Sequence, residues 1–187
     1  INIGGWLQEE MWMIPVVLQP EDTAKYETIV DHVTLWKAFE TRFGPEKMEN
    51  IRTAYRNAWI QEDDFYRIKQ AGFNTVRLPF FYDLVDEPKG LFYWLDKAVA
   101  YAQKHGLYLV LDMHGVPGRQ SGHMNTGQIN QNKFFKSKAH IQQTCQIWKD
   151  IAKRYKDCSN IAGYDLLNEP TGATNSPELY SVYTQLY

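Results

Sequence analysis

Apolar positions along the chain follow two spacings, a helical one of three to four residues and short continuous runs typical of buried strands. The helical spacing is clearest over residues 93–104, where Leu95, Ala98 and Ala102 share one face. A continuous apolar run over residues 107–113 follows directly, interrupted only near its end by an aspartate. Such a run is expected when helices cover a parallel strand.

The same pattern repeats along the chain, so short strands alternate with longer helices. The expected strands cover residues 2–6, 74–78, 107–113 and 161–167, and the expected helices cover residues 22–43, 46–59, 62–71, 93–104, 138–155 and 177–187. A long loop rich in Gly, Asn and Gln, residues 115–132, follows the third strand. Long loops inside a compact domain are usually functional.

Four β/α units in series predict a parallel sheet with right-handed crossovers. A doubly wound sheet and a (β/α)8 barrel both fit, but a doubly wound dinucleotide site requires a Gly-rich turn where this chain has Trp6-Leu-Gln-Glu-Glu10. Polar residues instead follow every expected strand, where a barrel builds its active site. We therefore expect an α/β fold of the TIM (β/α)8 barrel type. Residues 1–187 would supply about the first four β/α units, as the N-terminal half of a catalytic domain.

Composition narrows the possible partners. The 187 residues carry 20 basic and 22 acidic side chains, so the formal net charge is -2. This balance lacks the basic surface that nucleic acid binding requires, and no apolar stretch approaches the roughly 20 residues that span a bilayer. We expect no nucleic acid and no membrane as partner. Cys145 and Cys158 are too few for a disulfide framework and are interpreted as free thiols.

Arg77, Asp112 and His114 are the first candidate site residues. Arg77 lies between Val76 and Leu78, so it is expected to point into the barrel, where a guanidinium needs an anionic partner. That partner could belong to a structural ion pair or to an active site. Asp112 and His114 share a face by strand parity, which fits a hydrogen-bonded pair better than two metal ligands. We expect no metal and no cofactor.

The end of the fourth expected strand is a more specific indication of a functional site. Leu166-Leu-Asn-Glu-Pro170 combines an amide, a carboxylate and a proline there. Apolar neighbours are expected to bury Glu169 partly, and burial raises the pKa of a carboxyl toward the range that a general acid needs. A Glu-Pro pair at a helix entry is the ordinary structural alternative. Arg77 and His114 are expected at the same end of the barrel, which favours catalysis.

These residues form part of an ordered series that resembles glycoside hydrolase family 5, the cellulase family. The series is Gly4-Gly5-Trp6, Gly72-Phe-Asn-Thr-Val-Arg-Leu-Pro79, Leu111-Asp-Met-His-Gly115, Gly122-x-x-Asn125-x-Gly127 and Leu167-Asn-Glu-Pro170. The resemblance runs from residue 2 to about residue 172. It is closest to the branch of exo-β-1,3-glucanases and related β-glucanases, around Gly4 to Leu7, Trp12 and Gly115 to Gly118.

The resemblance implies a retaining double displacement on β-glucan oligo- or polysaccharide by two glutamates. Glu169 matches the acid/base, and Asn168 matches the amide that binds the substrate 2-hydroxyl. Arg77 and His114 match the residues that support these two. Retention requires two carboxyl groups about 5–5.5 Å apart, one protonated and one ionised. Arg77 is expected to keep the nucleophile ionised, which leaves the proton on Glu169.

Other positions are implied to bind the substrate. Glu10 matches a pocket acid of the exo-glucanase branch, and Asn125 lies in the matched loop, while Met124 stands where that branch has a second pocket acid. This departure makes an open, endo-acting or differently linked glucan site an alternative to exo action. Four side chains could stack on sugar rings or pack in the core: Trp6, Trp12, Tyr82 and His123.

The nucleophile of the family follows strand seven, which this chain does not include. The alternatives are a C-terminal half supplied elsewhere, a pairing of two half-barrels, or an inactive chain. An end inside the helical pattern 177–187 suggests a fragment, and an isolated half-barrel would expose strand edges. We therefore expect association with a C-terminal half-barrel or a second copy. The family implies an extracellular, cell-surface or periplasmic location.

The main alternative function is a non-catalytic carbohydrate-binding or structural half-barrel. A metal-dependent hydrolase is the third and least favoured alternative.

Overall fold

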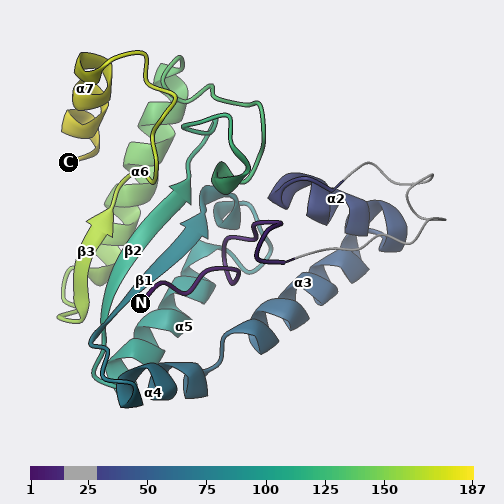
Figure 1. Ribbon diagram of the computed structural model, residues 1–187, viewed down its shortest axis with the longest axis vertical. Helices are drawn as coiled ribbons and strands as arrows, with labels where there is room; N and C mark the ends of the chain where they lie inside the picture. The colour runs from purple at the N-terminus through teal and green to yellow at the C-terminus, as the bar shows by residue number, and fades with distance from the viewer. Residues whose placement is uncertain (15–28) are drawn as a thin grey trace.

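A computed structural model describes residues 1–14 and 29–187, and a parallel sheet lies at its centre (Figure 1). The sheet has three strands in the order β1-β2-β3, with β1 at Thr75–Phe81, β2 at Tyr108–Gly115 and β3 at Ile161–Asp165. The α-helices are α2 (His32–Phe43), α3 (Pro45–Trp59), α4 (Glu62–Gln70), α5 (Leu91–Lys104), α6 (Lys138–Tyr155) and α7 (Ser176–Leu186). Two short 3-10 helices are η1 (Tyr82–Val85) and η2 (Met124–Thr126).

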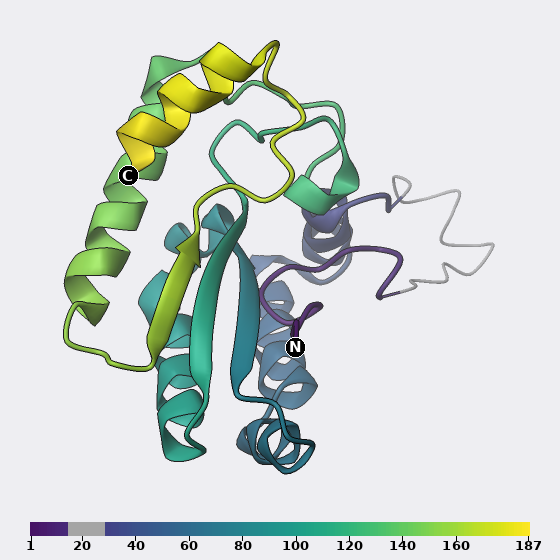
Figure 2. The same cartoon turned by 60° about the vertical axis from the view of Figure 1, so that its left-hand side comes forward.

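Helices α5 and α6 lie on one face of the sheet, and no described helix covers the opposite face (Figure 1; Figure 2). Helix α7 lies along α6 (Figure 2). Fully buried apolar side chains of β1 and β2 form the core beneath α5 and α6, together with Trp148 of α6, whose ring meets that of Phe80 edge to face. The face of the sheet that the helices cover is therefore an apolar core, and the polar groups of the sheet lie on the other face.

Most expected elements are confirmed, with the boundaries shifted by a few residues. The expected strand over residues 2–6 is wrong, because this segment makes one isolated parallel bridge to β1, Asn2 with Arg77, and the next bridge, Leu7 with Phe80, lies just after it. The expected helix 22–43 begins only at His32 within the described part of the chain, and residues 22–28 lie outside it. Asp31 explains this start, because its side chain accepts from the backbone of Thr34 in a capping box.

The continuous apolar run of β2 is fully buried on only one face of the sheet. Leu109, Leu111 and Met113 are fully buried on the helix-covered face, whereas Tyr108 is 50% exposed and Val110 only partly buried on the other. Both cysteines are free. Among the described helices, none is long and apolar enough to cross a membrane.

Candidate active site

Arg77 is the central cation on the face of the sheet that α5 and α6 leave uncovered. Its neighbours in β1, Val76 and Leu78, are fully buried on the opposite face, as the strand pattern predicted. Asp112 and Asp165 are partners in the register between β2 and β3, and each places Oδ2 2.9 Å from Arg77 Nη2. The anionic partner that the sequence required is thus a pair of aspartates on the two neighbouring strands.

Asn168 and His114 extend this network toward the strand tips. Arg77 Nη2 donates to Asn168 Oδ1 at 2.9 Å, and Asn168 Nδ2 lies 3.2 Å from His114 Nε2. His114 Nδ1 lies 2.6 Å from Asp112 Oδ2, so the predicted hydrogen-bonded pair is present. Burial alone would lower the pKa of His114, but the hydrogen bonds and charges of Asp112 and Glu10 raise it to about 9. His114 is therefore a cation in this site near neutral pH.

Glu10 is held on the opposite side of the imidazole. Its Oε1 lies 3.4 Å from His114 Nε2, and it also accepts from the Gln8 side chain. Trp12 Nε1 donates to the other oxygen, Oε2. Three donors thus fix the orientation of a nearly buried carboxylate.

Glu169 lies beyond the end of β3, at the rim of the same site. The expectation of partial burial is wrong, because the side chain is exposed in this chain. Its backbone adopts φ 44°, a left-handed conformation that is uncommon for a residue with a side chain. Asn125, from the long loop after β2, donates from Nδ2 to Glu169 Oε2 at 2.6 Å.

These groups line one cleft of about 570 Å³ at the carboxyl ends of the strands. The cleft brings together most of the predicted site residues, with one exposed indole and two methionines at its rim. Its lining comprises Asn2, Gln8, Glu10, Trp12, Met13, Arg77, His114, His123, Met124, Asn125, Asn168 and Glu169. Residues 115–132, predicted to be functional as a loop, supply three of them.

One predicted sugar contact is wrong, and another residue predicted to make one lies outside the described cleft. Trp6 is fully buried, where its ring meets Trp94 edge to face and its Nε1 donates to the carbonyl oxygen of Arg56 at 2.8 Å. Tyr82 is not among the residues that line the cleft, and the Arg119 guanidinium lies over its ring at 4.9 Å. Trp6 is therefore a packing residue, the alternative that its sequence context left open, whereas a sugar contact by Tyr82 stays a prediction.

Sequence reasoning missed the residues that support the site from behind. Gln120 Nε2 donates to the carbonyl oxygens of His114 and Asn168, at 2.8 and 2.7 Å, and so ties β2 to the end of β3. Asp165 and Gln8 were also missed. Asp165 pairs with Arg77, which is far from it in the sequence, so no local spacing indicates its role, whereas Gln8 donates to Glu10 only two residues away. Only the parity of Asp165 with Asp112 across the strands could have indicated its role.

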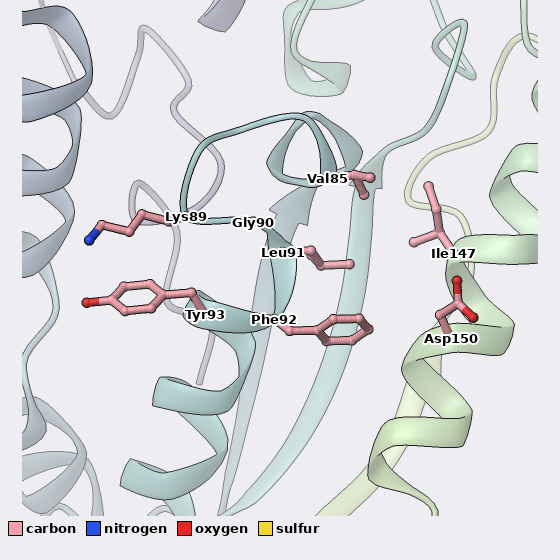
Figure 3. Close-up of a pocket in the computed structure, with 8 residues that line it drawn as sticks. All are labelled: Val85, Lys89, Gly90, Leu91, Phe92, Tyr93, Ile147 and Asp150. Atoms are coloured by element: carbon pink, nitrogen blue, oxygen red, sulfur yellow. The ribbon is translucent and has the colours of Figure 1, made fainter. Parts of the chain in front are cut away.

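A second pocket, of about 300 Å³, lies away from this chemistry, between the start of α5 and α6 (Figure 3). Val85, Leu91, Phe92 and Ile147 point into the same apolar space, with Asp150 at its edge. Within the described residues, no group of three or more His, Cys, Asp or Glu side chains is arranged to hold a metal ion. Carboxylates, amides and a charged imidazole therefore converge at the strand tips and not in this apolar pocket.

A parallel sheet with carboxylates, an amide and a histidine gathered at its strand tips is the arrangement of an active site at the carboxyl end of a (β/α) barrel. The sequence matches the family described as Cellulase (glycosyl hydrolase family 5) over residues 26–185. The chain belongs to glycosyl hydrolase family 5.

Curated relatives of similar sequence are named glucan 1,3-beta-glucosidases. The chain is 33% identical over 195 residues to a probable glucan 1,3-beta-glucosidase A of Neosartorya fischeri, covering 100% of this chain and 45% of that protein. It is 34% identical to a protein of the same name from Emericella nidulans, covering 99% and 46%. It is 30% identical to glucan 1,3-beta-glucosidase 1 of Schizosaccharomyces pombe, covering 92% and 43%. The chain thus spans about half the length of these relatives.

Solved structures agree on the fold. A rutinosidase from Aspergillus niger superposes with a TM-score of 0.72 at 18% identity, covering 91% of this chain and 48% of that one. A structure described as a glycoside hydrolase superposes with a TM-score of 0.56 at 21% identity, covering 67% and 41%. The predicted fold class, about half of a (β/α)8 barrel, is confirmed.

Proposed function

We propose that the protein containing this chain is a retaining glycosidase that hydrolyses β-glucan, with Glu169 as its acid/base. The observation that carries the proposal is the position of Glu169 at the rim of the cleft, where Asn125 holds its carboxyl group and the preceding residue, Asn168, joins the Arg77 network. The relatives named glucan 1,3-beta-glucosidases support the substrate class.

In the proposed reaction, Glu169 protonates the glycosidic oxygen while an ionised carboxylate attacks the anomeric carbon. The bond to the departing alcohol breaks, and a covalent glycosyl-enzyme forms. Glu169 then takes a proton from water, whose oxygen attacks the same carbon and releases the sugar and the carboxylate. The net change is addition of water across one glycosidic bond.

We propose that the nucleophile is not supplied by this copy of residues 1–187 but by a C-terminal half-barrel, or by a second copy that completes the barrel. Glu10 and Glu169 are the carboxylates that line the described cleft, and Glu10 is already bound by Gln8, Trp12 and His114. We assign Glu10 to substrate hydroxyls instead. Covering the exposed Glu169 with the rest of the barrel would supply the burial that an acid requires.

Glu169→Gln in the intact protein tests the proposal. We expect kcat on β-1,3-glucan to fall about 10²- to 10⁴-fold, the typical contribution of general acid–base catalysis, with glucan binding retained. Cleavage of an aryl β-glucoside with a good leaving group should fall less in its first step, because that group needs no proton. Added azide should restore turnover, since it attacks without a base. Glu46→Gln, at an exposed glutamate of α3, serves as the matched control.

A non-catalytic sugar-binding protein would show binding and no turnover in the wild type. A panel of β-1,3-, β-1,4- and mixed-linkage glucans would establish the linkage and, from the product lengths, the endo or exo mode. We propose an extracellular, cell-surface or periplasmic location, because a polymeric glucan is encountered outside the cytoplasm. Activity confined to a cytoplasmic fraction would contradict that location.

A further inference from the structure

A third cleft, of about 400 Å³, lies between α2, α3 and the segment after β1. It shares none of its lining residues with the cleft around Glu169. The two clefts meet through adjacent residues: Glu10 lines the first, whereas the Glu9 carboxylate lies 2.6 Å from Nδ1 of His32, which lines the third. Its volume falls within the range of about 300–1,000 Å³ that ligand sites occupy.

Two buried polar atoms of this cleft lack hydrogen-bond partners. Trp36 and Glu87 line it and are only 8% and 9% exposed. The Trp36 indole N–H and Glu87 Oε1 have no hydrogen bond within the described residues, although Glu87 Oε1 lies 3.3 Å from Arg52 Nη1. Buried polar atoms are nearly always paired, so the Trp36 N–H at the wall of this cleft is left to donate to a ligand that enters it, and Glu87 offers an acceptor beside it.

The walls of the cleft are held in place by charged groups. Arg56, which is fully buried, pairs with the other oxygen of Glu87 and also with Glu9. Arg52 lies over the Trp36 ring at 5.5 Å and pairs with Glu49 as well as Glu87. Because these pairs fix the side chains before any ligand arrives, little rotamer freedom remains to be lost on binding.

The mixed lining selects the class of ligand. Carboxylates of Glu40, Asp83, Asp86 and Glu87 oppose an anion. Arg52 and Lys37 oppose a cation, and Asp83 and Glu87 are already paired with arginines. A hydroxyl group can accept from the Trp36 indole and donate to Glu87, and the C–H face of a sugar suits the side chains of Val33 and Met48. We propose that this cleft is a second binding site for a neutral saccharide, separate from the catalytic cleft.

Nuclear magnetic resonance of the tryptophan indole groups tests this site directly in the intact protein carrying Glu169→Gln, which prevents hydrolysis. The Trp36 signal is assigned by its loss in Trp36→Phe. A β-1,3-linked glucose disaccharide is the first probe, a choice that rests on the proposed function. We expect the Trp36 signal to shift saturably and the signal of Trp94, another buried indole without a partner, to stay in place.

Trp36→Phe keeps an aromatic ring and removes the N–H, so saccharide affinity at this site should fall about fivefold. Trp94→Phe makes the same change outside the cleft and should leave affinity unchanged. Thermal unfolding of both variants establishes that each is folded. The Trp36 shift must also persist in Trp12→Ala, which disturbs only the catalytic cleft.

The site is overturned if the disaccharide and free glucose leave the Trp36 signal unmoved at tens of millimolar, which would mean that water satisfies both atoms. A shift produced by spermidine but not by sugars would overturn the ligand class. Loss of the shift in Trp12→Ala would show that Trp36 reports on the catalytic cleft. Failure of the proposed hydrolysis is measured separately, by product release, and leaves the Trp36 result standing.

Discussion

Asn125 donates from Nδ2 to Oε2 of Glu169 across 2.6 Å, and this bond joins the long loop after β2 to the end of β3. We predict that Asn125→Ala lowers kcat/KM about 10- to 100-fold, because hydrogen bonds to charged groups contribute about 1.5–3 kcal/mol. Asn125→Asp should lower it further by placing a second carboxylate against Glu169. Steady-state kinetics measure both, and an Asn125→Asp enzyme as active as the wild type would contradict the assignment.

Arg77 balances two aspartates on the uncovered face of the sheet. Arg77→Met should lower the free energy of unfolding by about 3 kcal/mol, since it leaves the fully buried Asp112 without its arginine. Arg67→Met breaks an exposed pair with Asp63 and should leave stability unchanged within error. Urea unfolding compares the two variants; equal losses would mean that the Arg77 network is not structurally important.

His114 should make stability depend on pH on the alkaline side. Its pKa is raised from 6.5 to about 9 in the folded chain. The protonated ring therefore stabilises the fold fully below pH 6.5, and this contribution is lost as the pH rises from 6.5 through 9. At about 1.36 kcal/mol per pKa unit, the loss is at most about 3 kcal/mol. Urea unfolding at pH 6, 7.5 and 9 should show a shallower decline for His114→Gln, and parallel pH profiles would refute this.

Trp6 and Trp12 provide a matched test of core against cleft. Trp6 is fully buried and Trp12 is 72% exposed at the rim of the cleft. Trp6→Ala should cost about 3–5 kcal/mol of unfolding free energy, as large-to-small core substitutions do. Trp12→Ala should leave stability nearly unchanged and raise KM for glucan. A raised KM in folded Trp6→Phe, or a large stability loss in Trp12→Ala, would reverse the two assignments.

Periodicity predicted α5 well because the helix buries one apolar stripe that includes Leu95, Ala98 and Ala102. The buried residues of α3 are instead Arg52 and Arg56, which an apolar stripe does not predict. The first strand was overpredicted because residues 2–6 have the apolar character of a strand but make only one isolated bridge to β1. The start of α2 depends on one cap, Asp31, which a window of apolar positions does not register. Local patterns thus predicted which elements are present better than they predicted where each element begins and ends.

The sequence predicted that Arg77, His114, Asn168 and Glu169 would meet at the carboxyl end of the sheet, and all four line the cleft there. The prediction for Trp6 was wrong, because its burial against Trp94 depends on packing between segments far apart in the sequence. The exposure of Glu169 was missed for the same reason: local apolar neighbours do not determine what lies across the cleft.

The backbone conformation of Glu169 lowers the stability of the fold at the position where the proposed chemistry needs a carboxyl group. A left-handed conformation at φ 44° costs a residue with a β-carbon about 1–2 kcal/mol, and glycine adopts it freely. Selection for folding alone would favour glycine there. Glu169→Gly should therefore unfold at a higher urea concentration than the wild type while losing turnover, so the most stable version of this strand tip would be one that does no chemistry.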